Sequence, residues 1–62
     1  MNFFSRTYGG FYFSYDGEVL KMFNSPDDNL PINESRCNLK DEKSFEIEIM
    51  WEVERYNETA NH

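Results

Sequence analysis

The clearest pattern in the chain is a turn signal between two stretches rich in strand-forming residues. Asp16-Gly17 separates residues 11–15 from residues 18–23, and aromatic, β-branched or long apolar side chains dominate both stretches. Asp-Gly is preferred in a two-residue type I′ turn, because both central residues of that turn need φ > 0. The sequence therefore predicts a β-hairpin in which Tyr15 pairs with Glu18.

Alternation along this hairpin divides its side chains between two faces. The predicted register also pairs Phe13 with Leu20 and Phe11 with Met22. One face, which is expected to form the core, carries Phe11, Phe13, Leu20 and Met22. The other face carries Tyr12, Ser14, Val19 and Lys21. Gly9-Gly10 is suited to a second tight turn, which predicts a further antiparallel strand over residues 3–8.

Apolar residues also alternate with glutamates toward the C-terminal end. Every odd position from 45 to 53 is apolar, and every even position from 46 to 54 except Met50 is Glu. This strict period-two pattern, together with β-branched Ile47, Ile49 and Val53, favours a half-buried strand within residues 44–56. A helix is the alternative, because Phe45, Ile49, Val53 and Tyr56 also fall on one helical stripe.

The middle region, residues 24–43, is polar and contains both prolines. Ser25-Pro26-Asp27-Asp28 has the residues of a helix start, and Pro31 would end that helix after about one turn. A second weak start at Asn33 or Ser35 would support a short helix through Lys43. We therefore expect a loop with a short helical turn or two.

These elements predict a single small domain over residues 1–62. Its parts are an aromatic β-hairpin or meander (1–23), a connecting segment (24–43), an acidic amphipathic strand (44–56) and a tail (57–62). The expected fold class is mainly β, or α+β with one short helix, built on an antiparallel sheet of three or four strands.

Composition and length limit what such a domain can do. The 62 residues are 39% hydrophobic and 18% aromatic, which is too apolar for a disordered acidic tail. A domain of this size buries only about 60% of the surface of its unfolded chain, so a closed substrate pocket is hard to build. An enzyme is therefore not expected.

Charge and cysteine content exclude further classes of partner and compartment. Six Lys+Arg against twelve Asp+Glu give a net charge of -6, whereas direct binding to nucleic acid or to an anionic membrane needs clustered basic residues. No stretch has the apolar length of a signal peptide core or of a membrane span, and the single Cys37 has no disulfide partner in the chain. We expect the protein in the cytoplasm.

The most informative feature is the row formed by Glu46, Glu48, Glu52 and Glu54. On a strand these carboxylates project from one face at two-residue steps of about 6.6–6.8 Å, which is comparable to the spacing of phosphates along a nucleic-acid strand. Such a row would imitate a phosphate backbone and bind a Lys/Arg groove of a larger protein. The alternative is a solvated sheet face whose like charges discourage aggregation through sheet edges.

No residue pattern predicts catalysis, a cofactor or a metal site. A general acid among these glutamates would need burial, which an open strand face does not provide. His62 is terminal, and Cys37 has no other histidine as a partner. Asp27-Asp28-Asn29 begins like a calcium loop, but Ile32 stands where that loop requires glycine.

Aromatic residues are expected both in the core and at an interface. Trp51 is expected to anchor the core, whereas Tyr12 and Tyr15 are expected to contact a partner, because tyrosines outside a small core are favoured at interfaces. The predicted core comprises Phe11, Phe13, Leu20, Met22, Phe45, Ile47, Ile49, Trp51 and Val53. So small a core leaves a marginal monomer, and association with itself or with a larger partner is expected.

The expected function is that of a non-enzymatic acidic binding protein or inhibitor that docks on a basic, nucleic-acid-handling surface of a larger protein. In size and charge the chain resembles the small accessory proteins that bacteriophages use against host enzymes and defence systems. Two alternatives are a structural subunit that assembles through its aromatic hairpin face and an antitoxin-like protein that masks a basic toxin.

Overall fold

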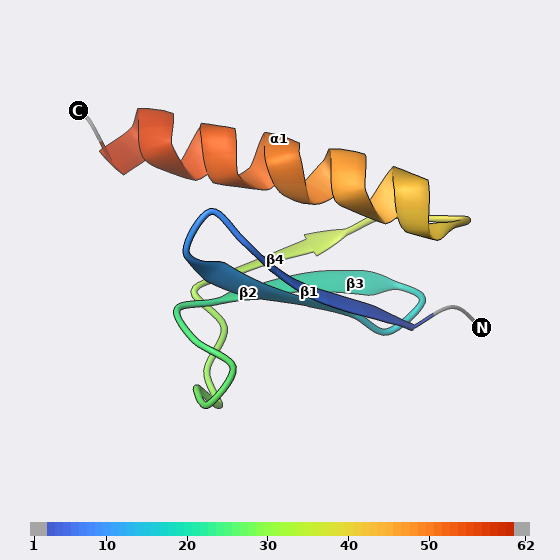
Figure 1. The fold of residues 1–62 in the computed structure, drawn as a ribbon, viewed down its shortest axis with the longest axis horizontal. Helices are drawn as coiled ribbons and strands as arrows, with labels where there is room; N and C mark the ends of the chain where they lie inside the picture. The colour runs from blue at the N-terminus through green and yellow to red at the C-terminus, as the bar shows by residue number, and fades with distance from the viewer. Residues whose placement is uncertain (1–2, 61–62) are drawn as a thin grey trace.

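In the computed structural model, which describes residues 3–60, the chain forms a four-stranded antiparallel sheet and one helix. The strands follow one another in chain order across the sheet, and the helix crosses one face of it (Figure 1). The elements are β1 (Phe4–Tyr8), β2 (Phe11–Tyr15), β3 (Val19–Phe23), β4 (Asn33–Arg36) and α1 (Glu42–Ala60). The predicted fold class, a small domain built on an antiparallel sheet, is confirmed.

The first hairpin joins β1 and β2 through the turn predicted at Gly9-Gly10. Tyr8 pairs with Phe11, and both glycines have positive φ, 60° and 86°, as a two-residue type I′ turn requires. A Cβ atom added to Gly9 would lie 3.0 Å from Cγ1 of Val53 on α1. Glycine at this position therefore serves both the backbone conformation and the close approach of the helix.

The second hairpin forms where it was predicted, but its register was predicted wrongly. Tyr15 pairs with Leu20 instead of Glu18, and three residues, 16–18, separate β2 from β3 instead of the two of a type I′ turn. The Asp16 carboxylate causes the longer loop, because its Oδ1 accepts hydrogen bonds from the backbone N–H groups of Glu18 and Val19 at 2.9 and 2.8 Å. A shift of two residues leaves every side chain on its predicted face.

The prediction of a strand within residues 44–56 is wrong, because these residues belong to α1. Asp41 precedes the helix as its N-cap, and its Oδ1 accepts a hydrogen bond from the backbone N–H of Ser44 at 2.8 Å. Glutamate is also a better helix former than strand former. The helical alternative was correct, since Phe45, Ile49 and Val53 are buried on one stripe of α1.

The core lies between α1 and the face of the sheet that it covers. Its buried hydrophobic residues are Phe13, Tyr15, Leu20, Met22, Leu39, Phe45, Ile49 and Val53. Aromatic rings join the two layers, with the Phe4 and Phe45 centroids 5.4 Å apart and those of Phe11 and Tyr56 5.3 Å apart. Two members of the predicted core, Ile47 and Trp51, are exposed instead, because they lie on the opposite side of α1.

The middle region contains a strand where a short helix was predicted. Ser25 to Asp28 form only a turn, in which the Asp28 N–H donates to the Ser25 carbonyl at 3.1 Å. The predicted helix from Asn33 or Ser35 to Lys43 is wrong, because β4 pairs with β3 and its ladder continues outward from both ends. At those ends Ile32 N–H donates to Met22 O at 2.7 Å, and Cys37 N–H donates to Glu18 O at 3.1 Å.

The C-terminal end also differs from the sequence prediction. Residues 57–60 of the predicted tail continue α1, so the helix has 19 residues. Residues 61–62, and with them His62, lie outside the described part of the chain.

Acid should weaken the fold partly through the two aspartates that accept backbone hydrogen bonds. Bonds from Ser44 lower the pKa of Asp41, and bonds from Val19 and Glu18 lower the pKa of Asp16, below the ordinary value of 3.8. A carboxyl with a lowered folded-state pKa contributes stability above 3.8 that is lost as pH falls through the lowered pKa. The double substitution Asp16→Asn and Asp41→Asn keeps an acceptor oxygen at both positions but cannot titrate. Denaturant unfolding at stepped pH should show a smaller acid loss for it, and identical profiles would contradict this account.

Candidate functional site

The four glutamates predicted to form one row point in different directions. Residues two apart on a helix lie on nearly opposite sides, whereas on a strand they would share a face. Glu46 forms an ion pair with Arg6 of β1, Glu52 is buried, and Glu48 lies 3.8 Å from Arg55. Of the four, Glu54 is exposed and takes part in none of the ion pairs found among residues 3–60. The predicted phosphate-like row on one face is therefore wrong.

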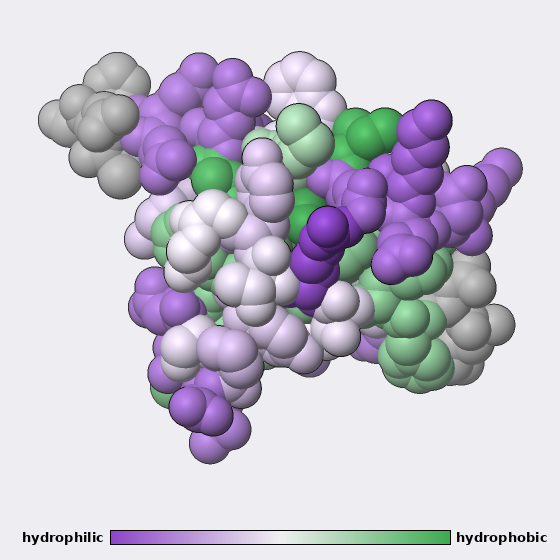
Figure 2. Space-filling model, viewed as in Figure 1, coloured by the Kyte–Doolittle hydropathy of each residue, from purple (hydrophilic) through white to green (hydrophobic). Residues whose placement is uncertain are grey.

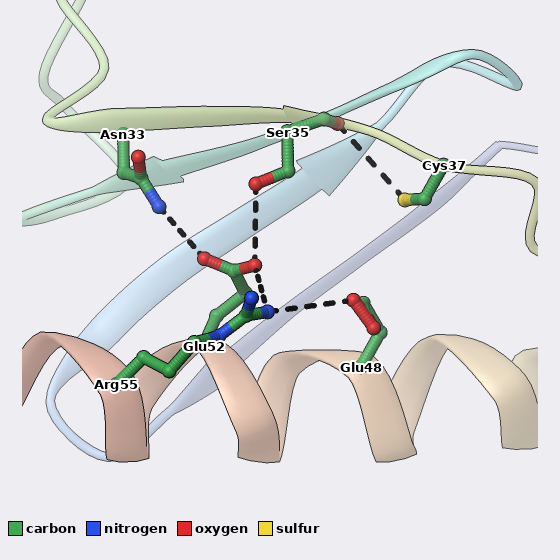
Figure 3. A network of polar contacts seen from close by, with 6 residues as sticks. All are labelled: Asn33, Ser35, Cys37, Glu48, Glu52 and Arg55. Carbon is green, nitrogen blue, oxygen red and sulfur yellow. Dashed lines mark hydrogen bonds and ion pairs between the residues drawn. The ribbon is translucent and has the colours of Figure 1, made fainter.

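Glu52 is the centre of a polar network that joins α1 to β4 (Figure 3). Only 4% of the residue is exposed. Its carboxylate accepts hydrogen bonds from Asn33 Nδ2 at 2.7 Å, from Ser35 Oγ at 3.2 Å and from Arg55 Nη2 at 2.6 Å. Arg55 also approaches Glu48, so one guanidinium bridges two carboxylates of the helix.

The Glu52 network borders an open hollow of about 340 Å³ between the end of α1 and β4. Its lining residues are Ile32, Asn33, Ser35, Glu52, Arg55, Tyr56 and Thr59. Since the Glu52 carboxylate already accepts three hydrogen bonds, it fixes the position of the helix on the edge of the sheet. We assign the network a structural role.

Cys37 lies beside this network and is half-buried. Burial, and to a lesser extent the negative charges of Glu48 and Glu52, raise the pKa of its thiol above the ordinary value. The reactive form of cysteine is the thiolate, which this environment disfavours. Cys37 is therefore suited to packing rather than to nucleophilic chemistry.

The side of α1 that points away from the sheet carries an exposed apolar cluster. Ile47, Met50 and Trp51 are 48%, 51% and 57% exposed, and their spacing of three and four residues makes them neighbours on the helix. Figure 2 shows apolar patches among the hydrophilic side chains along this part of the molecule. We define the outer face of α1 as Lys43, Ile47, Met50, Trp51, Glu54 and Glu58.

Sequence reasoning missed the outer face, although its signal was present. Once Phe45, Ile49 and Val53 are taken as a buried helical stripe, helical geometry places Ile47 and Trp51 on the opposite side. Ile47 and Trp51, which do not belong to the buried stripe, were instead interpreted as part of the alternating pattern of a strand. They are the residues that α1 leaves exposed.

A small hollow continues the outer face toward the edge strand β1. Its volume is about 100 Å³, and it is lined by Arg6, Tyr8, Glu46, Ile49 and Met50. Met50 belongs to both surfaces, so the hollow and the apolar cluster are contiguous. The ion pair between Arg6 and Glu46 forms one wall of it.

The two tyrosines predicted to contact a partner lie in different environments. Tyr15 is buried, where its hydroxyl donates to Cys37 O at 2.8 Å and accepts from Leu39 N–H at 2.9 Å. Its predicted role in partner binding is therefore wrong. Tyr12 is half-buried on the sheet face away from α1, and its ring centroid lies 6.0 Å from that of Phe23. We call the face that carries Tyr12, Ser14, Lys21 and Phe23 the open sheet face.

Within residues 3–60, no group of three or more His, Cys, Asp or Glu is arranged to hold a metal ion. The same residues contain no helix with the length and apolar character needed to cross a membrane. No protein-family model, curated protein or solved structure matches the chain.

Proposed function

We propose that this chain is a non-enzymatic binding protein that docks the outer face of α1 on a basic, nucleic-acid-handling surface of a larger protein. The observation that carries the proposal is the exposed cluster of Ile47, Met50 and Trp51 on a strongly acidic helix. Exposed apolar side chains with a charged surround are typical of interaction sites.

The charge of α1 supports a basic partner. Six of its residues are glutamates, against two basic residues, Lys43 and Arg55. At 1.5 Å per residue its 19 residues span about 28 Å, and although Glu52 is buried and Glu46 and Glu48 lie beside arginines, the helix keeps an excess of negative charge and forms an acidic rod. A groove lined by Lys and Arg, which normally holds a nucleic-acid backbone, would attract such a rod and speed its association.

Trp51 supplies the specific contact that charge alone lacks. Tryptophan is enriched among the residues that contribute most to binding energy at interfaces. On α1 it projects beside Ile47, with Glu54 and Glu58 following toward the end of the helix. An apolar anchor bordered by carboxylates is complementary to an apolar depression bordered by Lys or Arg. A phage protein that inhibits a host enzyme or defence system, acting in the host cytoplasm, would use a surface of this kind.

A second function has its own observation in its favour. The Tyr12 and Phe23 rings lie together on the open sheet face, where an assembly contact would bury them. This arrangement supports the structural-subunit alternative, in which the glutamates of α1 keep the protein in solution. An antitoxin-like protein that masks a basic toxin would instead use the outer face of α1, so it belongs with the first proposal.

Capture from cell extract with matched surface variants tests the proposal. The α1 variant combines Trp51→Ser, Glu54→Gln and Glu58→Gln, and the control is Tyr12→Ser on the open sheet face. We expect wild type and the Tyr12 variant to retain a nucleic-acid-binding protein that the α1 variant does not retain. The affinity of the α1 variant for that protein should be at least tenfold lower than that of wild type, a loss of about 1.4 kcal/mol. A duplex oligonucleotide should displace the captured protein, because both compete for one groove.

Two results would contradict the proposal. Retention by the α1 variant together with loss by Tyr12→Ser would assign the interface to the open sheet face. A captured protein that duplex DNA and RNA fail to displace would exclude a nucleic-acid groove as the binding surface. Circular dichroism of each variant must match wild type, which is expected because the changed α1 residues are exposed.

A further inference from the structure

We infer that the free protein pairs with a second copy of itself through the outer face of α1, with the two helices antiparallel about a two-fold axis. Three properties of this face carry the inference: an exposed apolar centre, a basic residue at one end and acidic residues at the other. A face with this order of charges is complementary to its own reverse.

Four of the six outer-face residues are placed symmetrically along the helix. Ile47 and Met50 lie at equal distances on either side of the point between residues 48 and 49, and so do Lys43 and Glu54. In a two-fold contact every pair of residues occurs twice. With the axis at that point, each Ile47 meets Met50 of the second copy, and each Lys43 meets Glu54 of the second copy.

Helical geometry places these matching residues on the same side of the contact. At 3.6 residues per turn, Lys43, Met50 and Glu54 lean to one flank of the outer face and Trp51 leans to the other. An antiparallel two-fold pair brings equal flanks together, so Lys43 reaches the flank that carries Glu54 of the second copy. A parallel pair would instead place Glu54 against Glu54 and Glu58 against Glu58, which like charges disfavour.

Lys43 and Glu54 cannot satisfy each other within one copy. They are 11 residues apart on one straight helix, 54 minus 43, which is about 16.5 Å along its axis. Lys43 and Glu54 can therefore pair with each other only between two copies, across the proposed contact. This property makes the pair a specific probe of the arrangement.

The apolar centre provides the driving force, and its area limits the strength. Pairing would cover Ile47, Met50 and Trp51, which are each about half exposed in the single chain. One helix face is smaller than the roughly 800 Å² per partner of a standard interface, and each copy carries a net charge of -6. The pair is therefore expected to be weak.

The pairing concerns the same face as the proposed function but does not rest on the proposed partner. A larger protein that binds the outer face would compete with the second copy, so partner binding and pairing would exclude each other. The self-associated form would keep Trp51 covered until such a partner is present. Sedimentation of the isolated protein tests the pairing separately from the docking.

A charge exchange measured by sedimentation equilibrium of the purified protein tests the inference. Lys43→Glu alone and Glu54→Lys alone should each weaken pairing about tenfold, because two attractive contacts per pair become repulsive. The double variant Lys43→Glu with Glu54→Lys should restore the wild-type dissociation constant. Trp51→Ser should weaken pairing at least tenfold while leaving the helical circular dichroism unchanged.

Two outcomes would overturn the inference. A wild-type chain that stays monomeric at all accessible concentrations would show that the outer face does not bind a second copy. Pairing that survives both single charge variants, or that the double variant fails to restore, would place the contact elsewhere on the molecule. Pairing abolished by Tyr12→Ser and unaffected by Trp51→Ser would place it on the open sheet face.

Discussion

Replacing Ile49 by alanine is expected to lower the free energy of unfolding by about 2–5 kcal/mol, whereas Trp51→Ala should change it by less than about 0.5 kcal/mol. Ile49 is fully buried between α1 and the sheet, and its truncation leaves a cavity. Trp51 is 57% exposed and belongs to the outer face. Denaturant unfolding of both variants, followed by far-ultraviolet circular dichroism, measures the difference.

This pair of variants also distinguishes the helix from a strand. On a strand, Ile49 and Trp51 would share one face, so both substitutions would be costly. Tryptophan emission gives a second measurement: in dilute solution, below the concentrations at which the chain pairs, the indole of Trp51 should emit at the long wavelength of a solvent-exposed ring and be quenched readily by acrylamide. A blue-shifted, protected emission together with a large loss of stability in Trp51→Ala would reject the helical arrangement.

Replacing Glu52 by alanine is expected to lower the free energy of unfolding by about 3 kcal/mol. The change removes a buried carboxylate that accepts bonds from Asn33, Ser35 and Arg55. Hydrogen bonds to charged groups contribute roughly 1.5–3 kcal/mol each, and the part-buried amide and hydroxyl would lose their acceptor. Thermal or denaturant unfolding near neutral pH measures the loss.

Glu54→Ala is the matched control for Glu52→Ala. Both substitutions remove one carboxylate from the same helix, but Glu54 is exposed, so its loss should change stability by no more than about 0.5 kcal/mol. Glu52→Gln, which keeps the shape of the side chain and one acceptor oxygen, should lie between the two. Equal effects of Glu52→Ala and Glu54→Ala would show that the network contributes little to stability.

Short-range signals in the sequence were sufficient to predict the first three strands of the sheet. Gly9-Gly10 and Asp16-Gly17 mark the first two turns, and the alternation around them places Phe13, Leu20 and Met22 on the buried face. The register of the second hairpin was not predictable from the dipeptide alone. It depends on the Asp16 side chain, whose hydrogen bonds to the backbone compete with the tightest turn.

The conformation of residues 45–53 could not be determined from periodicity alone. The stretch has two apolar surfaces, a buried stripe led by Phe45 and Ile49 and the exposed cluster around Trp51, and together they produce an apparent period of two. The N-cap at Asp41 and the abundance of glutamate favour the helix. The strand β4 was missed because Asn33 to Arg36 are polar, and only their pairing with β3 makes them a strand.

The candidate site stays a prediction, and only some of the residues expected in it lie on an exposed surface. Acidic side chains near an exposed aromatic residue remain the main feature, but Glu54 and Trp51 now stand together where Glu46, Glu48, Glu52 and Tyr15 were expected to contribute. Glu52 and Tyr15 were misassigned because polar atoms in a small core are recognised only through their partners, and all of these partners except Arg55 lie 17 to 24 residues away in the chain.

The Tyr15 hydroxyl sets an order of events during synthesis of the chain. Every strand pairing of the meander joins neighbours in sequence, so β1, β2 and β3 can associate as soon as they emerge from the ribosome. The hydroxyl's two partners, Cys37 and Leu39, are made more than 20 residues later, immediately before the helix. Until these two residues have been made, the Tyr15 hydroxyl lacks both partners, and the apolar face that carries it stays uncovered until α1 follows.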